Sequence, residues 1–356
     1  MVTLYVGSSE SFAGKTLLCI VLGLRFKTAG LRVAYFKPLG LMPTRVEGVT
    51  TDEDAAFVNE VLALGQSPDS LSGALVSPDI MAQAFRAQKI DVEAAIMKAF
   101  KSLSQHADIV LVGGLGSVLY TGMAVGLPTG RVTDMLDAQA LLIGKYRDER
   151  SVDAMLAAHD VLGDRAVGLI INEVPENQLA YVRETVIPFF QRRGIEAIGA
   201  LPRDQILNSL SVRELADTLN AEVLCCQEDV DELVEHFSVG AMSVESALRY
   251  FRRSPNKAVI TGGDRSDLQL AALETSTRCI VLTGDLRPDP RILSRAQEKR
   301  VPLLLTRDDT LTTVERIERV LGRLRVREQK KIRRAMELAN EHLDLLRLEE
   351  KLGLAR

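Results

Sequence analysis

The sequence contains few of the cysteine and histidine side chains that bind zinc, with only four of each among 356 residues. The cysteines are Cys19, Cys225, Cys226 and Cys279; no two of them form a CxxC pair, and no histidine stands at ligand spacing beside one. Structural zinc sites need such spacings, so we expect none. Because disulfides persist in oxidising compartments, we expect these thiols to be buried and reduced.

An excess of positive charge is also lacking, because the net charge is −4. General nucleic-acid binding needs a basic surface, so this charge argues against it. The first residues also lack the basic start of a signal peptide. One uncharged stretch, Ile109–Gly130, is long enough to suggest a membrane span, but it contains six glycines and Pro128. A strand followed by a glycine-rich loop explains this stretch better. We therefore expect a cytoplasmic protein that binds neither nucleic acid nor membranes.

Short β-branched runs alternate with helical patterns through the first part of the chain. Val2–Val6, Arg32–Phe36 and Ile109–Val112 have the character of strands, whereas Gly14–Lys27 has that of a helix. The apolar character of Ile109–Val112 is almost continuous, as in parallel strands that are buried on both faces. The alternation predicts an α/β fold with a parallel sheet, right-handed crossovers and helices on both faces.

The pattern changes around Cys225–Val239, where an acidic stretch precedes a second, shorter alternation of strands and helices. We predict a second, smaller α/β domain there. The end of the chain has the pattern of one long helix, with an apolar stripe that includes Leu338 and Leu345, and this helix is expected to pack on its own domain or on a second subunit. The predicted segments are 1–222, 223–325 and 326–356.

The strongest motif is the run Gly7-Ser-Ser-Glu-Ser-Phe-Ala-Gly-Lys-Thr16, which lies between the first strand and the first helix. A helix N-terminus and inward-pointing backbone N–H groups favour an anion. In a phosphate loop the lysine, here Lys15, reaches the β- and γ-phosphates, and the hydroxyl of Thr16 contacts Mg²⁺. The consensus has glycine where this chain has Ser9, so an ordinary strand–helix turn is the alternative. The predicted ligands are ATP and Mg²⁺, and the predicted nucleotide-binding residues of the loop are Ser9, Glu10, Ser11, Ala13, Gly14, Lys15 and Thr16.

Taken together with Tyr-Phe-Lys-Pro at Tyr35–Pro38, this loop resembles that of the dethiobiotin synthetase family, whose phosphate loop deviates from the consensus. The resemblance is closer still to the N-terminal region of long phosphate acetyltransferases. It covers about residues 1–225 and includes Gly-Leu-Ile-Ile-Asn at Gly168–Asn172 and Ile-Gly-Ala-Leu-Pro at Ile198–Pro202. It implies a P-loop NTPase-type sheet. No stretch resembling the acetyltransferase catalytic domain is recognised in the sequence.

The second part resembles the DRTGG domain, a regulatory module. The matching stretches include Val-Gly-Ala-Met-Ser at Val239–Ser243, Thr-Gly-Gly-Asp-Arg-Ser-Asp at Thr261–Asp267 and Leu-Thr-Gly-Asp-Leu-Arg-Pro at Leu282–Pro288. Glycines after a strand permit close backbone approach, so Asp264 could take a ribose hydroxyl and Arg265 a phosphate. The alternative is a turn with an internal Asp–Arg pair.

The synthetase resemblance also implies roles for single residues. The lysine matching Lys37 contacts phosphate and substrate, which gives it a catalytic role beside Lys15, and the aspartate matching Asp54 binds Mg²⁺. The asparagine matching Asn172 contacts the adenine edge, for which a side-chain amide is suited because it both donates and accepts hydrogen bonds. The loop around Pro202 would pack against the base.

One departure from the synthetase pattern concerns the metal. The synthetases have Val-Glu-Gly where this chain has Val112-Gly113-Gly114, and the glutamate helps to hold Mg²⁺. Gly113 has no side chain that could ligate a metal, and the loss of one oxygen ligand weakens metal positioning for phosphoryl transfer. An acid among Asp52, Glu53 and Glu10 could substitute for it.

These features lead to three hypotheses about function. The first is a nucleotide-sensing regulatory protein, with a second small-molecule effector at the DRTGG domain. The second is an ATP-dependent ligase or synthetase that acts through an acyl-phosphate or carbamoyl-phosphate intermediate. The third is a structural subunit that binds no nucleotide, although Lys15 and Thr16 argue against it. We also expect a homo-oligomer, since nucleotide-binding folds of this type often pair.

Overall fold

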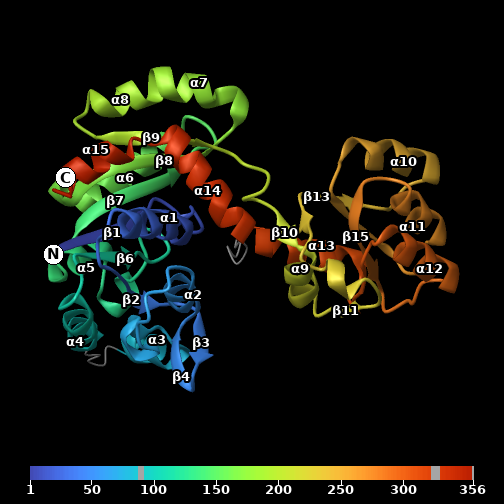
Figure 1. The fold of residues 1–356 in the computed structure, drawn as a ribbon, viewed down its shortest axis with the longest axis horizontal. Coiled ribbons are helices and arrows are strands. Elements are labelled where there is room, and N and C mark those ends of the chain that lie inside the picture. Colours follow the sequence, from blue (N-terminus) through green and yellow to red (C-terminus); the bar gives the residue numbers. More distant parts are fainter. Residues whose placement is uncertain (87–91, 322–328, 355–356) are drawn as a thin grey trace. The chain divides into compact units, whose positions relative to one another are not determined.

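The computed structural model describes residues 1–86, 92–321 and 329–354, and the side chains at 318–321 are not described (Figure 1). The chain divides into two compact units. The first comprises Met1–Arg203 together with Val326–Arg356, and the second comprises Asp204–Arg325. The second unit is therefore inserted, in sequence, between two segments of the first.

The first unit is built on a seven-stranded sheet in the order β5-β2-β6-β1-β7-β8-β9. All neighbouring strands pair in parallel, which confirms the predicted parallel α/β sheet. The central strands are buried almost throughout, as expected when helices cover both faces. The strands are β1 (Val2–Ser8), β2 (Val33–Gly40), β5 (Ser72–Leu75), β6 (Ile109–Gly113), β7 (Gln139–Lys145), β8 (Ala166–Val174) and β9 (Ala197–Pro202).

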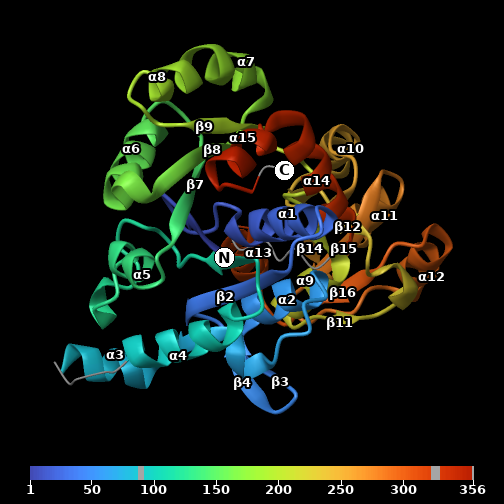
Figure 2. The ribbon, with the colours of Figure 1, turned by 60° about the vertical axis from the view of Figure 1, so that its left-hand side comes forward.

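The helices of the first unit cover both faces of this sheet (Figure 2). Side chains of α4, α5, α6 and α8 join the core on one face, whereas α1 contacts α2 and α14. A π-helical turn at Val182–Val186 joins α7 to α8. The helices before the second unit are α1 (Lys15–Thr28), α2 (Glu53–Val61), α3 (Pro78–Phe85), α4 (Val92–Ser104), α5 (Thr129–Met135), α6 (Ser151–Leu162), α7 (Leu179–Tyr181) and α8 (Ile187–Gln191).

A hairpin that the sequence did not indicate lies between β2 and α2. Its strands are β3 (Pro43–Val46) and β4 (Val49–Asp52), which pair antiparallel around Glu47 and Gly48. Both turn residues have positive φ, 52° and 81°, as the tightest hairpin turns require. The hairpin ends at Asp52, whose side chain caps α2 by accepting a hydrogen bond from the Ala55 N–H.

The second unit has its own five-stranded sheet in the order β11-β16-β15-β14-β13, which is parallel except for β11. Apolar residues pack on both of its faces in two clusters. A short antiparallel pair, β10 (Leu210–Ser211) and β12 (Leu233–Val234), accompanies it. The remaining elements are β11 (Glu222–Val223), β13 (His236–Val239), β14 (Lys257–Gly262), β15 (Thr277–Thr283), β16 (Leu303–Leu305), α9 (Val212–Leu219), α10 (Val244–Arg253), α11 (Ser266–Leu273), α12 (Pro290–Lys299) and α13 (Thr310–Leu321).

The end of the chain returns to the first unit as two helices, α14 (Gln329–His342) and α15 (Leu345–Lys351), where the sequence predicts one. The helix breaks because Leu343 bridges to Gly199 of β9 and the Asp344 N–H donates to the Ile198 carbonyl, at 2.8 Å. The Asp344 carboxylate then caps α15. Helices α14 and α1 lie side by side in both views (Figures 1 and 2). Residues 326–328 and 355–356 of the predicted helix lie outside the described residues.

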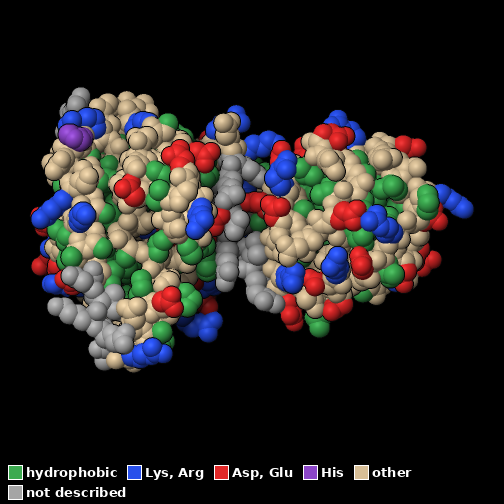
Figure 3. Space-filling view, turned by 90° about the horizontal axis from the view of Figure 1, so that it is seen from below, with side chains coloured by type: hydrophobic (Ala, Val, Ile, Leu, Met, Phe, Trp, Pro, Cys, Tyr) green, Lys and Arg blue, Asp and Glu red, His purple; other side chains and the backbone are tan. Residues whose placement is uncertain are grey.

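The described helices and surface agree with the composition. None of these helices combines the length and the apolar character that crossing a bilayer requires. Positive and negative side chains are interspersed on the face drawn in Figure 3, as a net charge of −4 allows.

Candidate functional site

The predicted phosphate loop forms at the carboxyl end of β1. The strand ends at Ser8 and α1 begins at Lys15, with Gly14 between them in a left-handed conformation at φ 98°. No side chain caps α1, and its first turn carries no acidic residue. The first backbone N–H groups of a helix lack intrahelical partners, so this end of α1 is suited to an anion.

Lys15 points back over the loop. Its ammonium donates to the Gly116 carbonyl at 2.6 Å and to the Ser8 hydroxyl at 2.7 Å. Burial, followed by the nearby charge of Lys37, lowers the pKa of Lys15 to about 8. The cation is thus held at the phosphate loop by the segment that follows β6.

That segment, residues 114–118, lies along the phosphate loop. The Ser117 hydroxyl donates to the Ser9 carbonyl at 2.7 Å, and the Val118 N–H donates to the Ser8 carbonyl at 2.8 Å. A Cβ on Gly116 would lie 3.2 Å from the Ser11 hydroxyl. A ligand that draws Lys15 away would therefore act directly on residues 114–118.

Lys37 lies within β2, which continues to Gly40, and is 5% exposed. Its ammonium contacts Asp52 at 2.7 Å and Asp54 at 2.8 Å. Burial alone would lower the pKa of Lys37, but the carboxylates of Asp54 and Asp52 outweigh it and raise that pKa. The charges of Lys37 and Asp54 also act on Lys15, so the structure brings these three predicted residues together.

Of the acids considered as substitutes for the missing glutamate, Asp52 and Glu10 are engaged elsewhere. Both carboxylate oxygens of Asp52 accept backbone N–H groups, from Ala55 on one side and from Leu41 and Met42 on the other. Glu10 pairs with Arg147 at 2.6 Å.

Gly113 ends β6 beside the phosphate loop, and Tyr35 fills the space next to it. A Cβ placed on Gly113 would lie 2.0 Å from the Tyr35 hydroxyl oxygen. The position of the synthetase glutamate is thus closed by a phenol from the neighbouring strand, which the sequence did not indicate because the two residues are far apart in it.

Asn172 lies near the end of β8 and donates to the Ala13 carbonyl at 2.9 Å. A Cβ on Gly14 would lie 3.0 Å from the same amide nitrogen. Gly14 therefore has a left-handed backbone and also lies close to the Asn172 side chain. Pro202 ends the adjacent strand and is paired with Val174. The predicted base-contacting residues therefore lie on neighbouring strands, and Asn172 touches the phosphate loop itself.

Thr16 lies in the first turn of α1 and is half-buried. No group of three or more His, Cys, Asp or Glu side chains suited to a metal ion occurs within the described ranges. In this part of the chain, Asp54 shares the Lys37 ammonium with Asp52, and neither acid belongs to a group of three.

A cavity of about 350 Å³ adjoins the loop. Its cations are each paired with an acid: Lys145 with Glu173 at 2.7 Å, Arg147 with Glu10, and Arg150 with Asp148. These residues were not predicted, although Lys145 directly follows an apolar run, at the strand end where ligands of open α/β sheets bind. The lining residues are Ser9, Glu10, Lys145, Arg147, Asp148, Arg150, Ser151 and Ala154.

In the second unit, β14 ends at Gly262, and Gly263, Asp264 and Arg265 lie between it and α11. The Arg265 guanidinium pairs with Asp267 at 3.0 Å and not with Asp264, which is exposed. A Cβ on Gly263 would lie 1.7 Å from the Leu286 carbonyl oxygen, so this glycine permits the close approach of two loops. The alternative interpretation is a turn with an internal Asp–Arg ion pair. Such a pair is present, but the acid that pairs with Arg265 is Asp267 and not Asp264.

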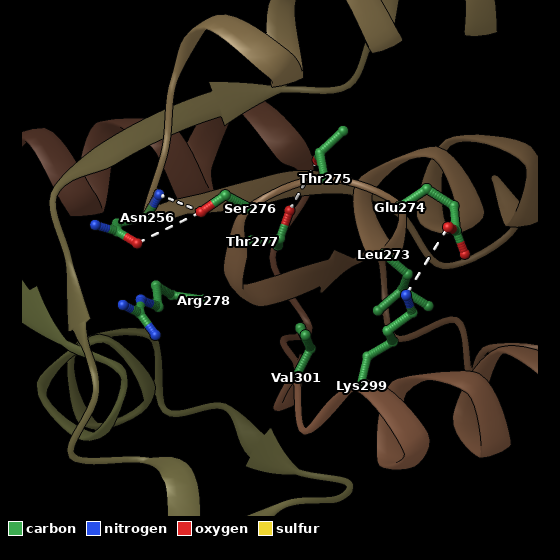
Figure 4. A pocket seen from close by; sticks show the side chains of 9 residues that line it. All are labelled: Asn256, Leu273, Glu274, Thr275, Ser276, Thr277, Arg278, Lys299 and Val301. Carbon is green, nitrogen blue, oxygen red and sulfur yellow. Dashed lines mark hydrogen bonds and ion pairs between the residues drawn. The ribbon is translucent and has the colours of Figure 1, made fainter.

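The opposite end of that sheet carries a hollow of about 270 Å³ (Figure 4). Ser276 accepts a hydrogen bond from the Asn256 N–H at its edge. The fully buried ammonium of Lys257 donates to Thr275 and to the Ser276 carbonyl, both at 2.9 Å. Glu274 and Lys299 lie on the other side.

Comparisons with known sequences agree with this arrangement. The AAA domain family matches residues 2–211, and the DRTGG domain matches residues 214–320. A phosphate acetyltransferase of Synechocystis is 28% identical over 96% of this chain and 50% of its own length. An ATP-dependent dethiobiotin synthetase of Methanococcus vannielii is 26% identical over 55% of this chain and 91% of its own. These matches confirm the predicted resemblances.

Solved structures show a partial similarity to this chain at low sequence identity. The MinC:MinD cell division complex of Aquifex aeolicus is 14% identical, with a TM-score of 0.36 over 58% of this chain and 84% of that one. The CBS and DRTGG domains of a Clostridium perfringens pyrophosphatase are 19% identical, with a TM-score of 0.30 over 44% of this chain and 73% of that one.

The sequence matches cover part of each relative and most of the first unit of this chain. The chain spans about half the length of the phosphate acetyltransferases it matches. The AAA domain match includes the phosphate loop and all seven strands of the first sheet. The chain therefore belongs to the AAA domain family, and a DRTGG domain follows its AAA domain.

Proposed function

We propose that this protein is a nucleotide-sensing regulator that binds ATP at the loop of residues 7–16. The observation that carries the proposal is the Lys15 ammonium, held at an uncapped helix N-terminus with Lys37 close by. Backbone N–H groups and two cations match the phosphates of a nucleotide. Asn172 and Pro202 would contact the base, and any Mg²⁺ that accompanies ATP would meet Thr16 and Asp54.

Sensing is supported by the contacts of residues 114–118. Lys15 now donates to the Gly116 carbonyl, so a phosphate that takes this ammonium removes one of the hydrogen bonds that hold the segment. Ligand occupancy would thus change a loop beside the sheet, and a ligand shifts a conformational equilibrium by its difference in affinity for the two states. The DRTGG domain would bind a second effector, with Asp264 and Arg265 as its predicted contacts.

An ATP-dependent ligase or synthetase is the second candidate, favoured by the presence of Lys15, Lys37 and Asp54 in one cluster. In that reaction a carboxylate or carbamate attacks the γ-phosphate, and the acyl phosphate then meets an amine. Such chemistry depends on precise positioning of the transferred phosphoryl group. Tyr35 closes the space where the synthetases carry a metal-binding carboxylate, which favours sensing over turnover.

Steady-state ATP hydrolysis separates the two candidates. We expect the full chain to hydrolyse ATP far more slowly than about 1 per second, the lower end of ordinary enzyme rates, with or without added carboxylic acids and amines. The Lys15→Ala variant controls for contaminating ATPases. A rate of about 1–10³ per second that disappears in Lys15→Ala would refute the regulatory function and favour the synthetase.

A further inference from the structure

The phenol of Tyr35 occupies the space beside Gly113, where the synthetases carry a metal-binding glutamate. Tyr35 lies in β2, which pairs with β6, and its ring reaches the last residue of that strand, Gly113. A Cβ on Gly113 would lie 2.0 Å from the hydroxyl oxygen and 2.9 Å from the ring carbon that carries it. No side chain can therefore share this space with the phenol.

The hydroxyl of Tyr35 is buried and keeps its proton. Tyr35 is 1% exposed, and its backbone N–H and carbonyl are both paired with the Gln66 side chain. Neither of these two hydrogen bonds involves the hydroxyl. Burial, followed by the electrostatic effects of Cys19, Asp54 and Asp52, holds the pKa of Tyr35 well above its usual value, so the proton stays on the oxygen.

The acids around this hydroxyl do not suit a Mg²⁺ site with two carboxylate ligands. Mg²⁺ needs oxygen ligands in near-ideal octahedral geometry. Asp54 already contacts Lys37 at 2.8 Å, and both oxygens of Asp52 accept backbone N–H groups. The place of a second carboxylate is taken by a neutral phenol that cannot lose its proton at ordinary pH.

We propose that the Tyr35 hydroxyl donates a hydrogen bond to a phosphoryl oxygen of the bound nucleotide, in place of a metal-binding carboxylate. The terminal phosphates are then held by Lys15, Lys37, the N-terminus of α1 and this phenol, and binding depends little on a divalent ion. Tyr35 and Gly113 act as a pair, because only glycine leaves room for the ring. This inference rests on the proposed binding of ATP at the same loop.

Calorimetric titration of the full chain with ATP tests it, in buffers that contain either Mg²⁺ or EDTA. For the unchanged protein we expect dissociation constants that agree within about threefold between the two buffers. Removal of a hydrogen bond to a charged group typically weakens binding about tenfold or more. We therefore expect Tyr35→Phe to bind ATP about tenfold more weakly, or weaker still, in EDTA. Tyr146→Phe is the matched control, since it removes another fully buried hydroxyl of the first unit and should leave the affinity unchanged.

A second variant restores the carboxylate that the synthetases carry where this chain has Gly113. Tyr35→Ala combined with Gly113→Glu makes room for the carboxylate and supplies it, and we expect Mg²⁺ then to strengthen ATP binding at least tenfold. Absence of ATP binding in both buffers would overturn the proposed function and this inference with it. ATP binding that requires Mg²⁺ in the unchanged protein, or equal affinities of Tyr35→Phe and Tyr146→Phe, would overturn this inference alone.

Discussion

At the residue scale, the two lysines of the phosphate site differ in their surroundings. Lys37 is paired with Asp52 and Asp54, and these carboxylates raise its pKa. Lys15 is held by a carbonyl and a hydroxyl, so burial dominates and its pKa falls to about 8. Of these two lysines, only Lys15 therefore loses its charge just above neutral pH.

This difference predicts how ATP affinity depends on pH. Binding needs the charged form of Lys15, which predominates below pH 8 and declines above it. The dissociation constant should be nearly constant below about pH 7, be about twofold higher at pH 8, and rise by about a further eightfold between pH 8 and pH 9.2. Titrations of the wild type and of Lys15→Arg between pH 7.5 and 9.5 check this expectation. A guanidinium stays charged over that range, so the rise should be absent in Lys15→Arg.

A flat profile in the wild type would show that Lys15 keeps its charge or does not contact the phosphates. An equal rise in Lys15→Arg would assign the titration to another group.

At the scale of elements, α15 joins the first unit through both packing and charge. Leu348 is fully buried, and Glu349 pairs with Arg25 of α1 at 2.5 Å. Arg347 and Lys351 both lie near Glu196, just before β9, at 3.4 and 3.5 Å. Helix α15 is thus part of the first unit. It contacts α1, the helix that begins at Lys15.

Two leucines of α15 give a matched test of this packing. Leu348 is 0% exposed and Leu346 is 67% exposed. Loss of a buried leucine side chain costs about 2–5 kcal/mol of unfolding free energy, whereas surface substitutions change it by about 0.5 kcal/mol or less. We expect Leu348→Ala to lower the melting temperature of the first unit clearly and Leu346→Ala to leave it nearly unchanged, as thermal unfolding would measure. Equal effects would contradict the position of α15 against β8 and β9.

At the scale of the whole molecule, the predictions that succeeded rest on local patterns. The apolar run at Ile109–Val112 indicates a buried parallel strand, and the strand–loop–helix order around Lys15 places the loop at the end of the first strand. These features depend on neighbours in the sequence, so their periodicity and order are sufficient to predict them.

Features that the sequence did not reveal depend on distant contacts. Tyr35 and Gly113 meet only when β2 and β6 pair, and Glu10 meets Arg147 only across the ends of β1 and β7. The break before Leu345 likewise needs the edge of β9 as its partner. The predicted roles of Asn172, Pro202, Asp264 and Arg265 in binding stay predictions, because they concern ligands.

The most direct test of the central claim is the melting of the whole chain, by scanning calorimetry, with and without saturating ATP. Each unit has its own sheet and core, so we follow the melting of the first unit, and the Lys15→Ala variant serves as the control. At a ligand concentration 100 times the dissociation constant, binding adds about 2.7 kcal/mol of stability. We predict that ATP raises the melting temperature of the first unit in the wild type and not in Lys15→Ala. No shift in the wild type, or an equal shift in Lys15→Ala, would contradict nucleotide binding at the phosphate loop.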